Sequence, residues 1–279
     1  MARKNAKVTF EPAKQRRRFS SIVSAIQNEE VETVIQLLKS DDLDLVDVQN
    51  MTVLHIATRC RDPQILQVLL EDHRIMQLLD RQMYNGDTPL LAAARHGNVA
   101  AVRILVDHGA DIESRKLDSG SNVLHYAARK PDCELMNVLL SRNPSPKFIN
   151  ATNFYGDTAL EVAMKEKSPT VQLLLQAGAD SSTPNSLTGR TLLHTGIAYD
   201  QCGFVNELAT SDNARSLMDA ADNRGDTPLL LAVRVECLEC IQTLINFLKP
   251  GNEVNKKTGE SILHMAVQTN QDSLLKYIL

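Results

Sequence analysis

The sequence predicts an all-α fold in which short helix-turn-helix repeats stack into a solenoid with protruding β-turn tips. Two series of short motifs carry this prediction: Gly-Asp-Thr tripeptides and Leu-His pairs each recur about every 70 residues, and the two series interleave. The glycines that open successive units are separated by 34, 36, 33, 36 and 34 residues, and they are Gly86, Gly120, Gly156, Gly189, Gly225 and Gly259. A regular period of this length is the signature of a stacked-repeat architecture.

The first helix of each repeat is expected to begin directly after a capping residue. The side-chain oxygen of such a residue accepts a hydrogen bond from a free amide of the first helical turn. The predicted caps are Thr52, Thr88, Asn122, Thr158, Thr191, Thr227 and Ser261. Pro89 and Pro228 follow two of them at the first helical position, where a missing N–H costs nothing.

The two helices of each repeat are predicted to be short and apolar on their packed faces. Small residues such as Ala93 and Ala94 let first helices approach closely, and the second helices are rich in Leu and Val. Residues 135–140 and 173–175 are examples. Helices this short are not stable alone, so their stability must come from stacking on neighbouring repeats. With a degenerate opening unit at residues 22–38, we count about eight repeats.

Composition and charge divide the chain into a basic arm and an acidic body. Residues 1–18 carry seven Lys or Arg and one Glu, a net +6, so a chain of net charge −4 leaves −10 for the remainder. We therefore expect a disordered arm at 1–18 and a single repeat domain at 19–279. No apolar run is long enough to cross a membrane. Five scattered cysteines favour reduced thiols inside the cell.

The repeats resemble ankyrin repeats, whose pattern runs Gly-x-Thr-Pro-Leu-His-x-Ala-Ala, from about Phe19 to Leu279. Residues 84–163 resemble more narrowly the middle repeats of the IκB family, which alternate shorter and longer connections. That resemblance implies an adaptor that binds Rel/NF-κB transcription factors in the cytoplasm or nucleus.

The chain departs from the signal-degraded IκB inhibitors in two ways. Asp118-Ser119-Gly120 lies inside a repeat and has Val123 where the family's degradation motif has a second Ser, and no acidic tail follows the repeats. With its basic arm, the chain looks more like the nuclear, atypical branch of the family.

Two sets of residues are predicted to contact a protein partner. The first, named the basic row, occupies the ninth position after the turn residue, with Asn50 taken as the turn residue of its repeat, and consists of Arg59, Arg95, Arg129, Lys165 and Arg234. Stacking would align the basic row along the concave side, where it would receive an acidic segment; the alternative is a solvated charged face. The second set lies at the turn tips and consists of Tyr84, Asn85, Phe154, Tyr155 and Arg224. The turn residues Asp87, Asp157 and Asp226 are expected to order the turns instead.

Metal and catalytic chemistry are not expected. The histidines of the Leu-His pairs are two repeats apart, too far for a shared ion, and are expected to brace hydrogen bonds between repeats. Cys237-Leu238-Glu239-Cys240 has zinc-ligand spacing but no second pair in the sequence. No phosphate loop or nucleophile motif is present, so we predict a non-enzyme that needs no metal or other cofactor.

The basic arm carries three short motifs. A bipartite nuclear import signal is predicted at Arg3, Lys4, Lys14, Arg16, Arg17 and Arg18, the alternative being a disordered basic arm that contacts nucleic acid or nothing. Ser20 follows Arg17-Arg18-Phe19 as in a basophilic-kinase site, and its phosphate is expected near a helix start. Lys7-Val8-Thr9-Phe10 resembles the docking motif of type 1 protein phosphatase regulators.

The leading interpretation is an IκB-like adaptor for a Rel/NF-κB-like transcription factor, in the nucleus and cytoplasm and monomeric when free. A targeting subunit of type 1 protein phosphatase that uses Lys7, Val8 and Phe10 is the alternative. Direct DNA binding by the acidic repeats is not expected, because phosphates would repel them. Leu274, Leu275, Ile278 and Leu279 end the last unit with no polar capping repeat, so either a partner covers this edge or the natural chain continues.

Overall fold

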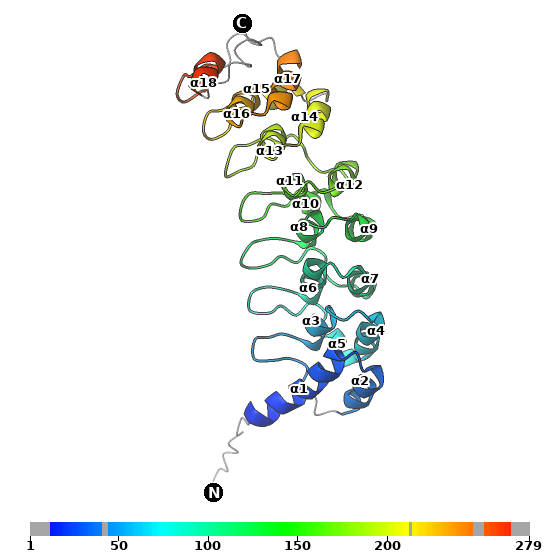
Figure 1. Ribbon diagram of the computed structural model, residues 1–279. Helices are drawn as coiled ribbons and strands as arrows, with labels where there is room; N and C mark the ends of the chain where they lie inside the picture. The colour runs from blue at the N-terminus through cyan, green and yellow to red at the C-terminus, as the bar shows by residue number, and fades with distance from the viewer. Residues whose placement is uncertain (1–11, 41–43, 212–213, 248–253, 269–279) are drawn as a thin grey trace. The chain divides into compact units, whose positions relative to one another are not determined.

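The computed structural model describes residues 12–40, 44–211, 214–247 and 254–268 of the chain (Figure 1). Across these residues the fold is all-α, as predicted, and β-structure is confined to two isolated antiparallel bridges, Val46 with Thr52 and Val254 with Ser261. None of the described helices is both long and apolar enough to span a bilayer. The chain divides into two compact units, Met1–Tyr126 (unit 1) and Ala127–Leu279 (unit 2).

Unit 1 is built from helix pairs. Its helices are α1 (Pro12–Gln27), α2 (Val31–Leu38), α3 (Val53–Ala57), α4 (Pro63–Glu71), α5 (His73–Met76), α6 (Pro89–His96), α7 (Val99–Asp107) and most of α8 (Val123–Ala128). The first helices α1, α3 and α6 pack in one row, and the second helices α2, α4 and α7 pack in another (Figure 1). The degenerate opening unit predicted at 22–38 is thus a helix pair.

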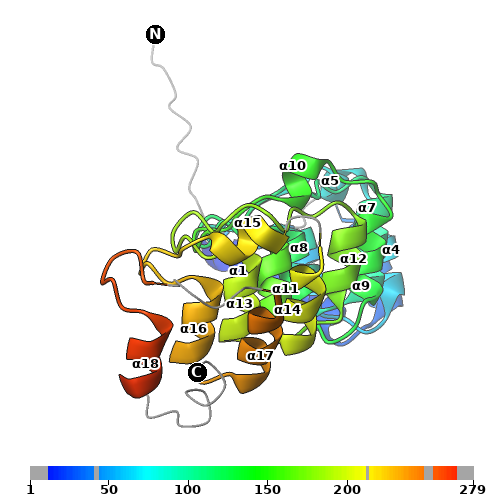
Figure 2. The same cartoon turned by 90° about the horizontal axis from the view of Figure 1, so that it is seen from above.

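Unit 2 repeats the arrangement. Its helices are α9 (Glu134–Leu140), α10 (Pro146–Ile149), α11 (Ala159–Lys165), α12 (Thr170–Gln176), α13 (Leu192–Ala198), α14 (Cys202–Ala209), α15 (Ala214–Asp219), α16 (Pro228–Arg234), α17 (Leu238–Phe247) and α18 (Ile262–Gln268). The first helices α11, α13, α16 and α18 pack in sequence order, and α14 packs on α17 (Figure 2).

All seven predicted helix starts are confirmed, because α3, α6, α8, α11, α13, α16 and α18 each begin at the residue after a predicted cap. Thr88 Oγ1 accepts a hydrogen bond from the Leu91 N–H at 3.2 Å, and Thr158 Oγ1 accepts one from the Glu161 N–H at 3.2 Å. Glu161 completes a capping box, because its carboxylate accepts from the Thr158 N–H. Burial raises the pKa of Glu161.

The packed helix faces follow the prediction with one correction. Ala93, Ala94 and Leu105 are fully buried, whereas Leu140, Leu173 and Leu175 are only half-buried. Consecutive helical residues are about 100° apart, so Leu173, Leu174 and Leu175 cannot all face the core. Leu174 is the one that does.

Three additional short helices account for the alternating repeat length. The longer connections, 36 residues from turn residue to turn residue, contain α5, α10 and α15, and the shorter ones have no such helix among their described residues. These helices insert apolar side chains into the core, among them Ile75, Phe148 and Met218. The structural period of the chain is therefore two repeats.

Helix α1 begins earlier than the basic arm was expected to end. It starts at Pro12, so Lys14, Arg16, Arg17 and Arg18 are helical instead of disordered. Pro12 is compatible with a first helical position, and Lys, Gln and Arg are strong helix formers, so nothing breaks the helix before Phe19. Ser20 is exposed in the middle of α1, and the expectation that its phosphate lies near a helix start is wrong.

The turn residues adopt a left-handed backbone conformation, with φ of +63° at Asn50 and +86° at Gly225. The Asn50 value confirms its assignment as the turn residue of a repeat that lacks Gly. At Gly225 an added Cβ would lie 2.8 Å from the backbone nitrogen of Lys257 in the next repeat. This glycine is therefore required both by its own φ and by close approach of the next turn.

We predict that Gly225→Ala lowers the free energy of unfolding by about 2–3 kcal/mol, because backbone strain and the contact with Lys257 add. The matched control is Gly178→Ala, which has φ of +88° but no heavy atom within 4 Å of the added Cβ; it is expected to cost about 1–2 kcal/mol. Urea unfolding followed by circular dichroism measures both. Equal losses in the two variants would show that the close approach of the next turn has no energetic effect.

Candidate protein-binding surface

The turn aspartates form ion pairs with members of the basic row. Asp87, Asp157 and Asp226 are buried, and each accepts from the cation eight residues later in its own repeat. The shortest distances are 3.3 Å for Arg95 Nη2 to Asp87, 2.6 Å for Lys165 Nζ to Asp157, and 2.9 Å for Arg234 to Asp226. A buried carboxylate needs such a partner. Arg95, Lys165 and Arg234 of the basic row are therefore each paired with a buried carboxylate, although 39% of the Arg95 side chain and 41% of the Arg234 side chain stay exposed.

Asp226 is bonded from three successive repeats. Its carboxylate accepts from Nε and Nη2 of Arg234 in the same repeat and from Asn255 Nδ2 of the next repeat at 2.7 Å. Its backbone carbonyl oxygen lies 3.0 Å from Nε2 of His194 in the preceding repeat. The Asp222 carboxylate accepts from the Asp226 N–H at 3.1 Å and so orders the turn itself. The turn aspartates thus have a structural role, but a different one from that expected: the Asp226 carboxylate bonds side chains of two repeats, and Asp222 orders the turn.

Asp87 has the same surroundings with one change. Lys116 stands where Asn255 stands relative to Asp226, four residues before the next turn glycine. Lys116 Nζ instead bonds Asp118 at 2.9 Å, and Asp87 Oδ1 has no hydrogen-bond partner among the described residues. The pKa of Lys116 is raised by its hydrogen bond to Asp118, with the charge of Asp87 contributing.

Two of the Leu-His histidines, His55 and His194, brace neighbouring repeats as predicted. In His55 and His194 the ring Nδ1 accepts from the backbone N–H of the capping Thr, so Nε2 carries the proton. His55 Nε2 then donates to the carbonyl oxygen of Asp87 at 3.0 Å. Burial lowers the pKa of both histidines, so they stay neutral at pH 7.

Arg59 and Arg129 differ from the rest of the basic row because their repeats lack the turn aspartate. Met51 and Ser121 take its place. Both arginines are exposed; Arg59 Nε donates to His96 Nε2 at 3.2 Å, and Arg129 Nε lies 3.7 Å from a Glu166 carboxylate oxygen that is itself half exposed. These two guanidinium groups are not tied to a buried charge.

Unit 1 brings three of its predicted contact residues to one cleft. The cleft has a volume of about 250 Å³, and its lining includes Arg59, Asn85 and Arg95. Glu29 and Asp87 line it too, so its charge is mixed rather than basic. Asn85 is also part of the turn: its Oδ1 accepts from the Asp87 N–H at 3.0 Å.

The predicted aromatic contacts are exposed at rigid turn tips. Tyr84 is 76% exposed in unit 1, and Phe154 and Tyr155 are 63% and 66% exposed in unit 2. The Tyr155 N–H donates to Asn153 Oδ1, which also accepts from the Asp157 N–H, so the turn is fixed beneath the rings. Arg224 is exposed at a tip of unit 2, and its N–H donates to Asp222.

The cysteines require a correction, because Cys202 and Cys240 are joined by a disulfide. Their Cα atoms are 5.3 Å apart because α14 and α17 of successive repeats pack together, which a separation of 38 residues in sequence does not reveal. Cys237 lies beside them, so Cys237 and Cys240 do have a nearby third sulfur. Cys60 is buried, its thiol donates to the Ile26 carbonyl oxygen, and burial raises its pKa to about 11.

Several predicted residues lie outside the described part of the chain: Arg3, Lys4, Lys7, Val8, Phe10, Leu274, Leu275, Ile278 and Leu279. The nuclear import signal, the phosphatase-docking motif and the uncapped last repeat therefore remain predictions.

Comparison with known proteins identifies the repeats. The sequence matches the family described as ankyrin repeats (3 copies) over residues 22–116, 73–148, 124–216 and 193–279. It is 31% identical over 142 residues to the mouse B-cell lymphoma 3 protein homolog, covering 50% of this chain and 31% of that protein. It is 28% identical over 149 residues to mouse NF-kappa-B inhibitor zeta, covering 52% of this chain and 19% of that protein.

A solved structure agrees with these matches. The ankyrin repeat domain of Bcl-3, described as a unique member of the IκB protein family, superposes with a TM-score of 0.66 at 24% identity, covering 80% of this chain and 97% of that domain. The chain is 26% identical to the ANK repeat-containing protein nipk-1 of Caenorhabditis elegans, covering 65% of this chain and 33% of that protein. It spans a third or less of the length of the first curated relatives.

Removing the Arg234 guanidinium is predicted to destabilise the fold. Arg234→Met leaves the buried Asp226 carboxylate without its ion-pair partner, so we expect a loss of about 1–3 kcal/mol in the free energy of unfolding. Arg129→Met, the same change at an exposed arginine of the basic row, is expected to stay within about 0.5 kcal/mol. Denaturant unfolding compares them, and a similar loss in both would contradict the role assigned to the turn aspartate.

Stability is predicted to fall in mild acid because of His55 and His194. Their pKa values lie below the ordinary value of 6.5 in the folded protein, so below pH 6.5 the unfolded chain binds more protons and folding weakens until the folded pKa is reached. Each histidine contributes up to about 1.4 kcal/mol per pH unit in that window.

The His194→Asn variant isolates one of these contributions. Below pH 6.5 its free energy of unfolding is expected to fall less steeply with decreasing pH than that of the parent chain, the slopes differing by up to about 1.4 kcal/mol per pH unit. Above pH 7 the two slopes are expected to be equal. Urea unfolding at a series of pH values gives the difference. Parallel pH profiles would mean that the pKa of His194 does not differ between the folded and the unfolded protein.

Proposed function

Since the chain belongs to the ankyrin-repeat family, we propose that it is a non-catalytic adaptor that binds a Rel/NF-κB-like transcription factor and modulates its activity. Its ankyrin repeats are related to those of IκB-family proteins, among them NF-kappa-B inhibitor zeta and the chicken NF-kappa-B p105 subunit, which is 28% identical over 60% of this chain and 17% of its own length. Ankyrin repeats are a protein-binding architecture. The choice of a Rel-class partner rests on that relationship.

The exposed aromatic tips are the observation that carries the binding role. Three large rings remain in water at turns whose backbone is fixed by side-chain hydrogen bonds. Exposed aromatic side chains on a rigid support lose little conformational freedom on binding and are enriched among the residues that dominate protein interfaces. Tyr84 in unit 1 and Phe154 and Tyr155 in unit 2 are therefore the contacts we rank first.

Charge selects a second set of contacts. Because Arg95, Lys165 and Arg234 are committed to buried aspartates, Arg59 and Arg129 are the members of the basic row best placed to receive acidic groups of a partner. Exposed ion pairs of this kind raise the rate of association and weaken as salt is added. The acidic body of the chain disfavours direct contact with DNA phosphates, so any DNA contact would pass through the partner.

The basic arm fits the same function. Import into the nucleus through Arg3, Lys4, Lys14, Arg16, Arg17 and Arg18 would bring the adaptor to a transcription factor there, while a cytoplasmic pool would meet it before import. The free protein is proposed to be a monomer. Phosphorylation of Ser20, which is exposed on α1, would add negative charge next to the predicted import signal.

We expect purified Rel-homology dimers to bind the chain, and Tyr155→Ala to weaken the complex about tenfold or more, because a rigid interfacial ring is lost. Tyr199→Ala, which removes a tyrosine at the end of α13, away from the turn tips, is the control. Arg129→Glu is expected to weaken binding most at low salt. Isothermal titration calorimetry measures these affinities, and absence of any complex at micromolar protein would eliminate the Rel-class proposal.

The second candidate, a type 1 phosphatase subunit, is favoured only by Lys7-Val8-Thr9-Phe10 standing ahead of the repeats. Co-purification with the Phe10→Ala variant separates the two candidates. If the chain is a phosphatase subunit, this change should abolish binding of the phosphatase. If it is a Rel-class adaptor, the change should leave the Rel complex intact.

A further inference from the structure

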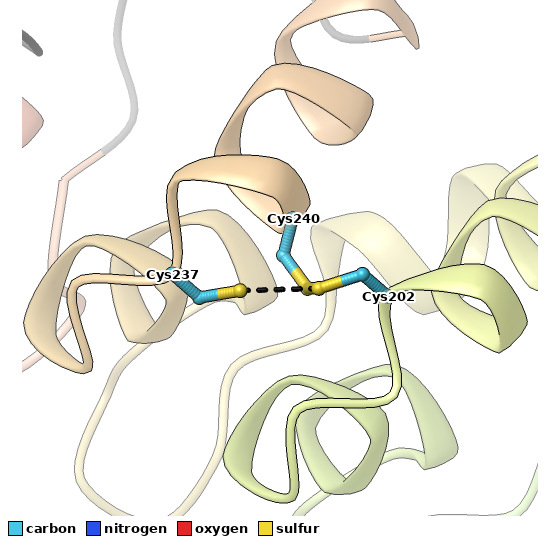
Figure 3. A group of neighbouring side chains, drawn as sticks. All are labelled: Cys202, Cys237 and Cys240. Atoms are coloured by element: carbon cyan, nitrogen blue, oxygen red, sulfur yellow. Dashed lines mark hydrogen bonds between the residues drawn. A yellow bond between two sulfur atoms is a disulfide. The ribbon is translucent and has the colours of Figure 1, made fainter.

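Three cysteines of two successive repeats meet at one point in unit 2. Cys202 is the first residue of α14, Cys240 lies in the first turn of α17, and Cys237 directly precedes α17 (Figure 3). Their sulfur atoms all lie within 4.8 Å of one another. Cys202 and Cys240 form the disulfide, and the Cys237 sulfur lies 3.1 Å from the Cys202 sulfur.

The three sulfurs differ in access to solvent. Cys202 is 6% exposed and Cys240 is fully buried, whereas Cys237 is partly exposed. Because Cys240 is fully buried and Cys202 nearly so, a thiol reagent in solution has poor access to this disulfide while the helices that cover it stay folded. It can reach Cys237.

We propose that Cys237 is a thiol-exchange site through which small thiols such as glutathione open and close the Cys202–Cys240 disulfide. A sulfur–sulfur bond is about 2.05 Å long, so bond formation between Cys237 and Cys202 requires the two sulfurs to approach by only about 1 Å. The Ile241 N–H donates to the Cys237 carbonyl oxygen at 3.0 Å, which places Cys237 at the N-terminal end of α17.

The first step moves the disulfide without net oxidation. Cys237 loses its proton to solvent, and its thiolate attacks the Cys202 sulfur. The Cys237–Cys202 bond forms, the Cys202–Cys240 bond breaks, and its electron pair leaves on the Cys240 sulfur, which takes up a proton. The disulfide now includes Cys237, the most exposed of the three cysteines.

Two further exchanges reduce it. A glutathione thiolate attacks the Cys237 sulfur, forms a mixed disulfide there, and releases Cys202, which takes up a proton. A second glutathione thiolate attacks the glutathione sulfur of that mixed disulfide, releasing glutathione disulfide and the Cys237 thiol. The protein disulfide and two glutathione molecules thus become two protein thiols and one glutathione disulfide, and the reverse sequence closes the link.

The consequence is a reversible link between repeats. The disulfide joins α14 to α17, the second helices of successive repeats, which also pack on each other. Opening it would leave α16, α17 and α18 joined to the preceding repeats by the polypeptide chain and by noncovalent contacts. The thiol state of the surroundings would then set the stability of this part of unit 2.

The rate of disulfide reduction tests the proposal. The oxidised full-length chain is mixed with reduced glutathione, quenched with N-ethylmaleimide at intervals, and digested for mass spectrometry of the Cys202 and Cys240 peptides. In Cys237→Ser the disulfide is expected to open about tenfold or more slowly than in the parent chain, because an intramolecular thiol is replaced by direct attack on a buried bond. Cys133→Ser, which removes another partly exposed thiol, is expected to leave the rate unchanged.

Two further readouts make the result decisive. The quenched parent chain is expected to carry glutathione on Cys237, and in concentrated guanidinium chloride the parent and Cys237→Ser are expected to react at the same rate, because unfolding exposes every sulfur. Equal rates in the folded proteins would overturn the proposal. So would a parent chain that, after exposure to glutathione disulfide, contains no Cys202–Cys240 link.

Discussion

The buried aspartate of the Gly-Asp-Thr turn is the constraint on which the repeat structure depends. A carboxylate in a closed interior is costly unless cations and N–H groups surround it. Asp226 draws these groups from three places: a guanidinium of its own repeat, an amide of the next, and, through its carbonyl oxygen, an imidazole of the previous one. Each partner is useful only when its own repeat is folded and in register. One residue thereby makes the folding of three repeats interdependent.

This constraint explains why the chain has a period of two repeats. A repeat that contributes the bracing histidine is followed by one that contributes the aspartate, as in His55 with Asp87 and His194 with Asp226. The longer connections, which contain α5, α10 and α15, lie in sequence between the histidine of one repeat and the aspartate of the next. The buried apolar residues of these three helices extend the core there. Hydrogen bonding and packing thus alternate together along the chain. Neither a short nor a long repeat contains both the histidine and the aspartate that bond to each other.

Much of this fold could be predicted from sequence because the helix starts are local. A capping oxygen and the amides it bonds are within three residues, so Thr88 and Thr227 reveal their helices directly. The pairing of Arg95 with Asp87 was missed, although both residues were singled out, because it depends on how the turn folds back on the helix. The cysteine cluster was missed because Cys202 is a repeat away from Cys237. The helix α5 was missed because four residues show no periodicity.

The pairing of arginines with buried aspartates also limits which residues can contact a protein partner. An arginine that neutralises a buried carboxylate cannot turn to a partner without leaving that carboxylate unpaired, which costs more than a surface ion pair returns. The repeats that lack the aspartate, with Met51 and Ser121 in its place, escape this conflict, because Arg59 and Arg129 have no turn aspartate to neutralise. The aromatic tips avoid it differently, since their turn bonds use backbone N–H groups and leave the rings uncommitted. Stability and binding are therefore assigned to different residues of the same repeat, and a change at a tip ring can alter the partner without weakening the stack.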